Sequence, residues 1–266
     1  MRKRLLVLVI SFAVALSPHA GDSALRAQES DAQVKARVLQ GTITVSAASS
    51  LSDPFVVIAK SFRKINPKTK IRFNFGSSSS LVAQIQAGAP SDVIASADLE
   101  SIEKLVKSGA VSRVDYPQVF AHNQMAIAVK PGNPLKINSI SDFARANYIA
   151  LCSINAPCGI YAAQVLGKAL VVINESKITR AVDARATLNA VAFGDADAAI
   201  VYLTDVLSAK KYVDRVEIGS SQNVKTAYAL GAIRSSKNQD LAEAFISYVL
   251  SSDGQAVLKS FGFAKR

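Results

Sequence analysis

The chain has 266 residues, 50% of them hydrophobic, and carries a formal net charge of +11. Beyond the basic N-terminus, lysine and arginine are scattered singly or in pairs, which is typical of a solvated surface or of a field that steers anions. Without a basic run, the sequence gives little support to nucleic-acid binding, and we expect no nucleic-acid partner.

The first residues have the pattern of a secretory signal peptide. Three basic residues, Arg2–Arg4, precede an apolar run at 5–16 that is too short to span a bilayer. Small residues follow, and we expect cleavage after Ala27, so that residues 1–27 are removed and the rest is periplasmic. An uncleaved N-terminal anchor is the alternative, and it also leaves the domain outside the cytoplasm.

The two cysteines, Cys152 and Cys158, are six positions apart. In an oxidising compartment a disulfide is the favoured state of such a pair, and closing so small a loop contributes roughly 2–3 kcal/mol in the chain-entropy model. The spacing differs from CxxC, so we expect no redox catalysis. Two buried free thiols are the alternative.

Apolar, strand-like segments alternate with amphipathic helical ones along the chain, which predicts an α/β fold built on largely parallel sheets. In chain order we expect a strand at 43–47, a helix opened by Asp53 and Pro54, a strand at 71–75, a helix around 81–85, a strand at 92–95, a helix at 99–107, a strand at 148–151, helices at 160–170 and 184–193, a strand at 198–202 and helices after 236. The apolar face of the first helix is expected to comprise Phe55, Ile58, Ala59, Phe62 and Ile65.

Two long apolar stretches, 119–129 and 228–233, interrupt this alternation and lack a helical period. Extended segments that lie so far apart in the sequence are typical of crossovers between two lobes. We therefore expect one lobe to comprise 40–124 plus 227–266, and the other to comprise 125–226.

Most motifs of enzyme active sites are missing. The signal peptide contains His19, so His122 would be the only histidine after cleavage, which argues against a His-based triad or a His-rich metal site. The sequence has no G-x-S-x-G elbow, no Walker A motif and no G-x-G-x-x-G after a strand. We therefore expect no catalytic residues, no protein-ligated metal and no cofactor.

Serine and glycine are concentrated where strands are expected to end and helices to begin, which is where open sheets bind ligands. The first half offers 47–52 and 76–81, and the second half offers 157–162, 183–186 and 200–205. Free N–H groups at a helix start and serine hydroxyls can bind an anion. Ordinary N-capping explains the serines equally well, and Tyr202 taken alone is more often a buried tyrosine than a ligand contact.

Five segments in this order resemble those of the periplasmic molybdate-binding proteins of ABC importers. They are AASSL at 47–51, GSSSSL at 76–81 with Gln84-Ile85, GAPSDV at 88–93, PCGIYA at 157–162 and GDADAAIVY at 194–202. The resemblance extends over 43–263. It implies a two-lobed, type II periplasmic binding protein, in which each lobe is a mixed, mostly parallel sheet flanked by helices and the ligand lies in the cleft between the lobes.

The resemblance also implies the ligand and its contacts. Carried over by motif, the oxyanion-binding groups are the hydroxyls of Ser50, Ser78 and Tyr202 and the backbone N–H groups of Cys158 and Ala184. The family commonly has alanine at the position of Cys158 and valine at that of Ala184, but a backbone N–H does not depend on the side chain. The placement of Ala184 is the least secure, because the preceding segment, 175–182, matches the family poorly.

The function implied is capture of molybdate or tungstate by a monomer and delivery to an ABC-transporter permease in the inner membrane. Molybdate, tungstate and sulfate only accept hydrogen bonds at neutral pH. Monohydrogen phosphate has an O–H that finds no acceptor in a site made of donors, and leaving it unpaired costs about 1–3 kcal/mol of binding free energy. The alternatives are a receptor for sulfate or another oxyanion, an enzyme acting on a phosphate or sulfate ester, and an adhesion or signalling domain that has lost its ligand.

Overall fold

The structure is a computed structural model that describes residues 38–112 and 118–265. The expected signal peptide at 1–27 lies outside the described residues. The described residues from Leu39 onward belong to one compact unit. No helix among the described residues has the length and the apolar character needed to cross a membrane.

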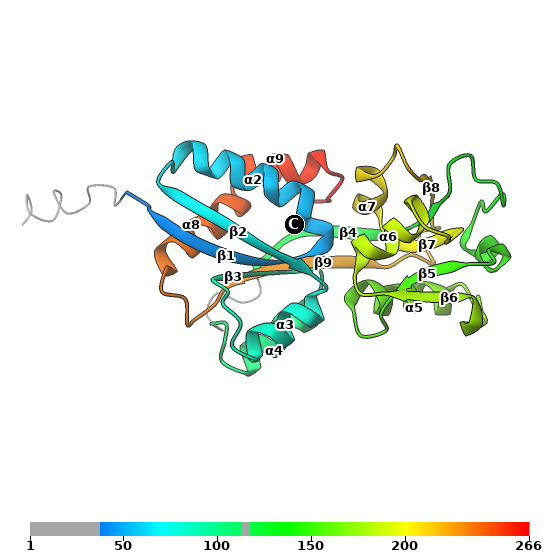
Figure 1. The fold of residues 1–266 in the computed structure, drawn as a ribbon, viewed down its shortest axis with the longest axis horizontal. Helices are drawn as coiled ribbons and strands as arrows, with labels where there is room; N and C mark the ends of the chain where they lie inside the picture. The colour runs from blue at the N-terminus through cyan, green and yellow to red at the C-terminus, as the bar shows by residue number, and fades with distance from the viewer. Residues whose placement is uncertain (1–37, 113–117, 266) are drawn as a thin grey trace, which may run out of the picture. The chain divides into compact units, whose positions relative to one another are not determined.

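Strands and helices alternate along most of the described chain (Figure 1). The strands are β1 (Gly41–Ala48), β2 (Thr69–Gly76), β3 (Val93–Ser96), β4 (Gln118–Val129), β5 (Ile149–Cys152), β6 (Ile178–Ala181), β7 (Ala198–Tyr202), β8 (Asp214–Val216) and β9 (Lys225–Ala232). The α-helices are α2 (Ser52–Ile65), α3 (Ser78–Gln86), α4 (Leu99–Lys107), α5 (Pro157–Lys168), α6 (Ala184–Ala192), α7 (Leu203–Ser208), α8 (Gln239–Leu250) and α9 (Ser252–Ser260). Short 3-10 helices are η1 (Ser49–Leu51), η2 (Ile140–Arg145) and η3 (Glu175–Lys177).

The strands of the described residues form one sheet in the order β2-β1-β3-β9-β4-β7-β5-β6, and β8 pairs with β4. The pairs β1–β2, β1–β3, β5–β6 and β5–β7 are parallel, as expected for strands joined by helices. Every pair that includes β4 or β9 is antiparallel. The sheet is thus mixed, because the two long strands run against their neighbours.

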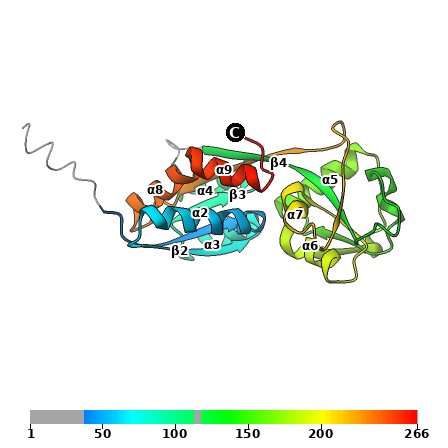
Figure 2. The same cartoon turned by 90° about the horizontal axis from the view of Figure 1, so that it is seen from above.

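Strand β4 changes partners along its length. Gln118–Gln124 pairs with β9, whereas Met125–Val129 pairs with β7, and the last three of these residues also pair with β8. We call β1, β2, β3 and β9 the first strand group and β5, β6, β7 and β8 the second strand group. Figures 1 and 2 show β4 and β9 running from one group toward the other. The long apolar stretches of the sequence are these two strands.

The first strand group is covered by helices on both faces. Val93 and Ala95 of β3 belong to the same apolar cluster as helix α2, whereas Ile94 belongs to a second cluster with α3 and α4. This alternation reflects the two-residue period of a strand. Figure 1 shows α2 and α9 on one face and α3 and α4 on the other.

Helix α2 buries the expected apolar face with one exception. Phe55, Ile58 and Phe62 are buried, and the rings of Phe55 and Phe62 both contact Phe245 of α8. The expectation for Ile65 is wrong. It is the last residue of the helix and 67% of it is exposed, because the chain turns away there toward β2.

Two differences from the expected elements affect the loops beside the second strand group. Helix α5 begins at Pro157, three residues before the expected start at 160, because proline suits the first turn of a helix. Strand β6 was not expected, because it lies at the edge of the sheet and its exposed positions carry polar side chains. The earlier start places Cys158 in the first turn of α5.

Candidate functional site

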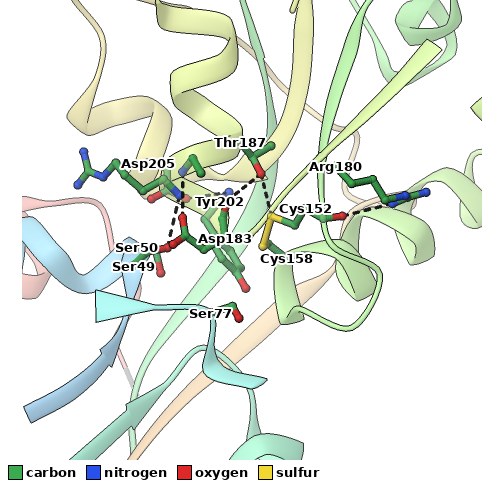
Figure 3. The surroundings of a disulfide bond; sticks show 12 residues. Ser49, Ser50, Ser77, Cys152, Cys158, Arg180, Asp183, Thr187, Tyr202 and Asp205 are labelled. Carbon is green, nitrogen blue, oxygen red and sulfur yellow. Dashed lines mark hydrogen bonds between the residues drawn. A yellow bond between two sulfur atoms is a disulfide. The ribbon is translucent and has the colours of Figure 1, made fainter. Parts of the chain in front are cut away.

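A small cavity lies where segments that follow strands of the first group meet segments that follow strands of the second group. Its lining residues are Ala48, Ser49, Ser50, Gly76, Ser77, Ser78, Ala97, Pro157, Cys158, Ala184 and Tyr202. The lining includes all five residues that the sequence analysis assigned to an oxyanion site. Figure 3 shows that Ser49, Ser50 and Ser77 belong to other segments of the chain than Tyr202 and Cys158.

Ser50 comes from η1, which directly follows β1. Its side chain is buried, and its Oγ lies 2.9 Å from the hydroxyl of Tyr228 on β9. Asn123 of β4 lies behind this pair, with its Nδ2 3.4 Å from the same tyrosine hydroxyl. Ser50 therefore faces the cavity while a buried hydrogen bond holds it from behind.

Two neighbouring serines at the start of α3, Ser77 and Ser78, have different hydrogen-bond partners. Ser77 is the N-cap, and its Oγ accepts a hydrogen bond from the Ser80 N–H at 3.3 Å. Ser78 is fully buried, and its Oγ accepts from the Ala97 N–H at 3.0 Å. The capping interpretation is thus correct for Ser77. The Ser78 hydroxyl keeps its own proton available for another acceptor.

Helix α5 points its N-terminus at the cavity. The N–H of Cys158 lies in the first turn, where no partner exists within a helix. A disulfide joins Cys158 to Cys152 at the end of β5, with 5.8 Å between the Cα atoms, which confirms the expected bond. Gly159 is required next to it, because a Cβ there would lie 2.1 Å from the Ser153 carbonyl oxygen. The loop from 153 to 157 is therefore held tightly against the helix start.

Helix α6 also begins at the cavity. Its N-cap is Asp183, whose carboxylate accepts from the Ala186 N–H at 2.9 Å. The N–H of Ala184 is in the first turn, like that of Cys158, and is free of the helix's own ladder. The helix starts where the sequence predicted, although the approach to it resembles the family poorly.

Tyr202 is the last residue of β7 and is only 2% exposed. Its hydroxyl oxygen has no hydrogen-bond partner among the described residues. A buried hydroxyl without a partner costs free energy, and one that also lines a cavity is suited to bind a ligand there. Burial raises the pKa of Tyr202 well above its ordinary value, so the group stays protonated and can donate a hydrogen bond.

A buried carboxyl group lies directly behind Tyr202. Asp205 accepts from the Tyr202 backbone N–H at 3.3 Å through one oxygen, and its other oxygen has no partner among the described residues. Burial raises the pKa of Asp205 to about 7, and the positive charge of Arg185 opposes this effect. The site therefore has a titratable neighbour that does not line the cavity.

An ion pair lies beside the cavity. The Arg185 guanidinium reaches from α6 to α2, where it lies 2.6 Å from the Asp53 carboxylate and 2.6 Å from the Ser52 hydroxyl. The Arg185 backbone N–H also donates to Ser49 Oγ at 3.4 Å. Because the lining of the cavity contains no lysine, arginine, aspartate or glutamate, its donors are uncharged.

This arrangement can hold a small anion that only accepts hydrogen bonds. Five hydroxyl-bearing residues, Ser49, Ser50, Ser77, Ser78 and Tyr202, and the N-termini of α5 and α6 converge on one cavity. Helix N-termini favour negative charge. Within the described residues no group of three or more His, Cys, Asp or Glu side chains could hold a metal ion.

Sequence reasoning missed the residues behind the site. Tyr228 and Asn123 belong to long apolar strands, and no local motif marks them as partners of Ser50. Arg185 belongs to 183–186, one of the segments expected to bind an anion. Its contact with Asp53 could not be predicted, because the two helices that carry these residues are far apart in the sequence.

The chain belongs to the family of bacterial extracellular solute-binding proteins, whose family model matches residues 43–264. The molybdate-binding protein ModA of Mycobacterium tuberculosis (strain ATCC 25618 / H37Rv) is 33% identical over 225 residues, which cover 84% of this chain and 85% of that protein. Among solved structures, the periplasmic molybdate-binding protein of Azotobacter vinelandii has a TM-score of 0.76 at 22% identity and covers 84% of this chain and 99% of its own. The sulfate-binding protein SubI of Mycobacterium tuberculosis H37Rv has a TM-score of 0.77 at 18% identity, covering 85% and 87%. These two structures support the fold.

Proposed function

We propose that the protein captures molybdate outside the cytoplasm and delivers it to the permease of an ABC importer. One observation carries the proposal: a cavity lined by uncharged donors includes a buried Tyr202 hydroxyl that has no partner among the described residues. Membership of a solute-binding family and the 33% identity to a molybdate-binding protein support the choice of ligand.

In this proposal the oxyanion accepts hydrogen bonds from both strand groups. Ser50 and Ser78, which follow β1 and β2 of the first group, donate through their hydroxyls. The backbone N–H groups of Cys158 and Ala184 and the hydroxyl of Tyr202 donate from the second. Each of these residues lines the cavity, and the described contacts leave the protons of Ser78 and Tyr202 available.

We also propose that the described chain has two lobes, 40–124 plus 227–266 and 125–226, that close on the ligand by a hinge motion. The change of partners along β4 between Gln124 and Met125 supports a boundary at that point. The contacts of Arg185 with Ser49, Ser52 and Asp53 would form on closure.

The donor lining favours fully deprotonated oxyanions. Molybdate, tungstate and sulfate accept at every oxygen, whereas monohydrogen phosphate brings a proton that has no acceptor here, at a cost of about 1–3 kcal/mol. Tungstate should therefore bind as molybdate does. Discrimination against sulfate depends on the size of the cavity rather than on its hydrogen bonds.

The proposed location of the protein is the periplasm. Cleavage after Ala27 would release a monomer into the periplasm, where the Cys152–Cys158 disulfide is stable. The role is binding and delivery, without catalysis and without a bound cofactor.

Isothermal titration of the purified protein with molybdate, tungstate, sulfate and phosphate tests the proposal. We expect tight binding of molybdate and tungstate, weaker binding of sulfate and the weakest binding of phosphate. Sulfate binding as tight as that of molybdate would identify a sulfate receptor instead. Turnover of phosphate or sulfate esters would identify an enzyme.

A further inference from the structure

Ser50 is the only proposed ligand contact whose hydroxyl is hydrogen-bonded to another hydroxyl among the described residues. Between Ser50 Oγ and Tyr228 Oη, at 2.9 Å, either oxygen could donate. The direction of this bond determines whether the Ser50 proton points at Tyr228 or into the cavity. The orientation of a third residue, Asn123, settles the direction.

The Asn123 amide has one acceptor and one donor end, and its surroundings fix which is which. Its Oδ1 accepts from the Gln124 backbone N–H at 2.9 Å. Its Nδ2, which only donates, lies 2.9 Å from Thr204 Oγ1 and 3.4 Å from Tyr228 Oη. The reversed amide would set its NH₂ group against a backbone N–H, so Tyr228 receives a hydrogen bond from Asn123.

Because the Tyr228 hydroxyl accepts a hydrogen bond from Asn123, Ser50 Oγ is the acceptor that the described residues offer to its own O–H. Tyr228 is fully buried, and burial raises its pKa, so the hydroxyl keeps that proton. The lone pair of Ser50 Oγ that faces the protein is then occupied. The remaining direction for the Ser50 proton is the cavity, where Ser78 is held in the same sense by the Ala97 N–H.

We propose that Tyr228 and Asn123 are positioning residues that hold Ser50 as a hydrogen-bond donor to the oxyanion and thereby set the rejection of protonated oxyanions. This inference rests on the proposed function. A serine hydroxyl without such a partner can rotate and accept a proton from its ligand, which would relieve the unpaired O–H of monohydrogen phosphate. Selectivity would then depend on residues that do not contact the ligand.

The test compares Tyr228→Phe with the unmodified protein. Molybdate is titrated directly at pH 8, where inorganic phosphate is mainly the monohydrogen dianion. Sulfate and phosphate, two dianions of similar size that differ by a proton, are titrated as competitors of molybdate. We expect Tyr228→Phe to weaken molybdate and sulfate binding by about tenfold while phosphate binding stays constant or strengthens, so that the sulfate-to-phosphate preference falls by about tenfold or more.

Two further variants separate positioning from packing. Thr226→Val removes a buried hydroxyl from the same strand that has no partner among the described residues, and it should leave the sulfate-to-phosphate preference unchanged. Asn123→Ala removes the donor at the far end of the chain of hydrogen bonds, and it should lower the preference in the same direction as Tyr228→Phe. Melting temperatures without ligand show that each variant is folded.

A parallel loss of sulfate and phosphate affinity in Tyr228→Phe and Asn123→Ala, with an unchanged preference, would overturn the inference and leave the proposed function standing. Failure of the unmodified protein to bind any oxyanion would overturn the proposed function, and the inference with it.

Discussion

At the scale of single residues, the site is marked by buried polar side chains that line the cavity and have a donor or acceptor not used within the protein. Ser77 and Ser78 both line the cavity, but the Ser77 hydroxyl caps helix α3, whereas the Ser78 hydroxyl accepts from the Ala97 N–H and has its own proton free. Tyr202 gives the clearest signal, because it lines the cavity and its hydroxyl is buried without a partner among the described residues. A sequence alone cannot separate these cases, since capping and ligand contact use the same residue types at the same place.

Tyr202→Phe should weaken molybdate binding by about tenfold or more and leave the melting temperature of the ligand-free protein unchanged or slightly raised. The variant removes a donor to the ligand and breaks no internal hydrogen bond. Ser78→Ala should also weaken binding, but with a small loss of stability, because the Ala97 N–H loses its acceptor. Tyr161→Phe is the control, since Tyr161 contacts the Tyr202 ring without lining the cavity. Unchanged molybdate affinity in both site variants would remove the site assignment.

Asp205 should make the stability of the protein depend on pH. Its pKa is raised from the ordinary 3.8 to about 7, so the folded state holds this proton more tightly than the unfolded chain does. The stabilising contribution is therefore complete below about pH 4 and is lost as pH rises through about 7, a change on the order of a few kcal/mol. Asp205→Asn, which cannot ionise, should flatten the decline in melting temperature between pH 5 and pH 8. The same decline in the variant would show that Asp205 is not its source.

At the scale of elements, the alternation of strands and helices followed from the hydrophobic periodicity, and helix α4 lies where the sequence predicted it. Edge strand β6 and the start of α5 were misjudged, because exposed polar positions and a proline at a helix start weaken the periodic signal. The ends of the elements decide the site, since the first turn of α5 carries the Cys158 N–H. Periodicity is least informative at such ends.

The Cys152–Cys158 disulfide should stabilise the loop that presents this N–H. Replacing both cysteines by alanine should lower the free energy of unfolding by roughly 2–3 kcal/mol and weaken molybdate binding only moderately, because the backbone donor remains. Urea unfolding and molybdate titration of the double variant measure the two effects. Complete loss of binding in a folded double variant would mean that the sulfur atoms, rather than the N–H, are essential.

The Arg185–Asp53 ion pair between α6 and α2 should favour the closed arrangement. Both side chains are about one-third or more exposed, so the pair contributes at most about 1 kcal/mol. Asp53→Asn should therefore weaken molybdate binding by up to about fivefold, and less so at high salt. Glu100→Gln removes the same charge from a surface pair on α4 and should leave the affinity unchanged. A rise in affinity for Asp53→Asn would instead indicate that Asp53 acts only by repelling the anion.

At the scale of the whole molecule, the sequence predicted that segments at 47–51, 76–81, 157–162 and 194–202 belong to one site, and the structure brings the named residues of all four to one cavity. That prediction came from the resemblance to a family, because local patterns indicated only serine-rich helix starts. The buried partners Asn123 and Tyr228 lie on the two long antiparallel strands, and their contact with Ser50 is visible only once the chain is folded.

The most direct test of the account is a crystal structure of the protein grown with molybdate, with the metal located by its anomalous scattering. The account predicts one molybdenum atom in the cavity, with its oxygens at hydrogen-bond distance from Ser50 Oγ, Ser78 Oγ, Tyr202 Oη and the N–H groups of Cys158 and Ala184. Molybdenum bound elsewhere, or oxygens held by charged side chains instead of these donors, would contradict it.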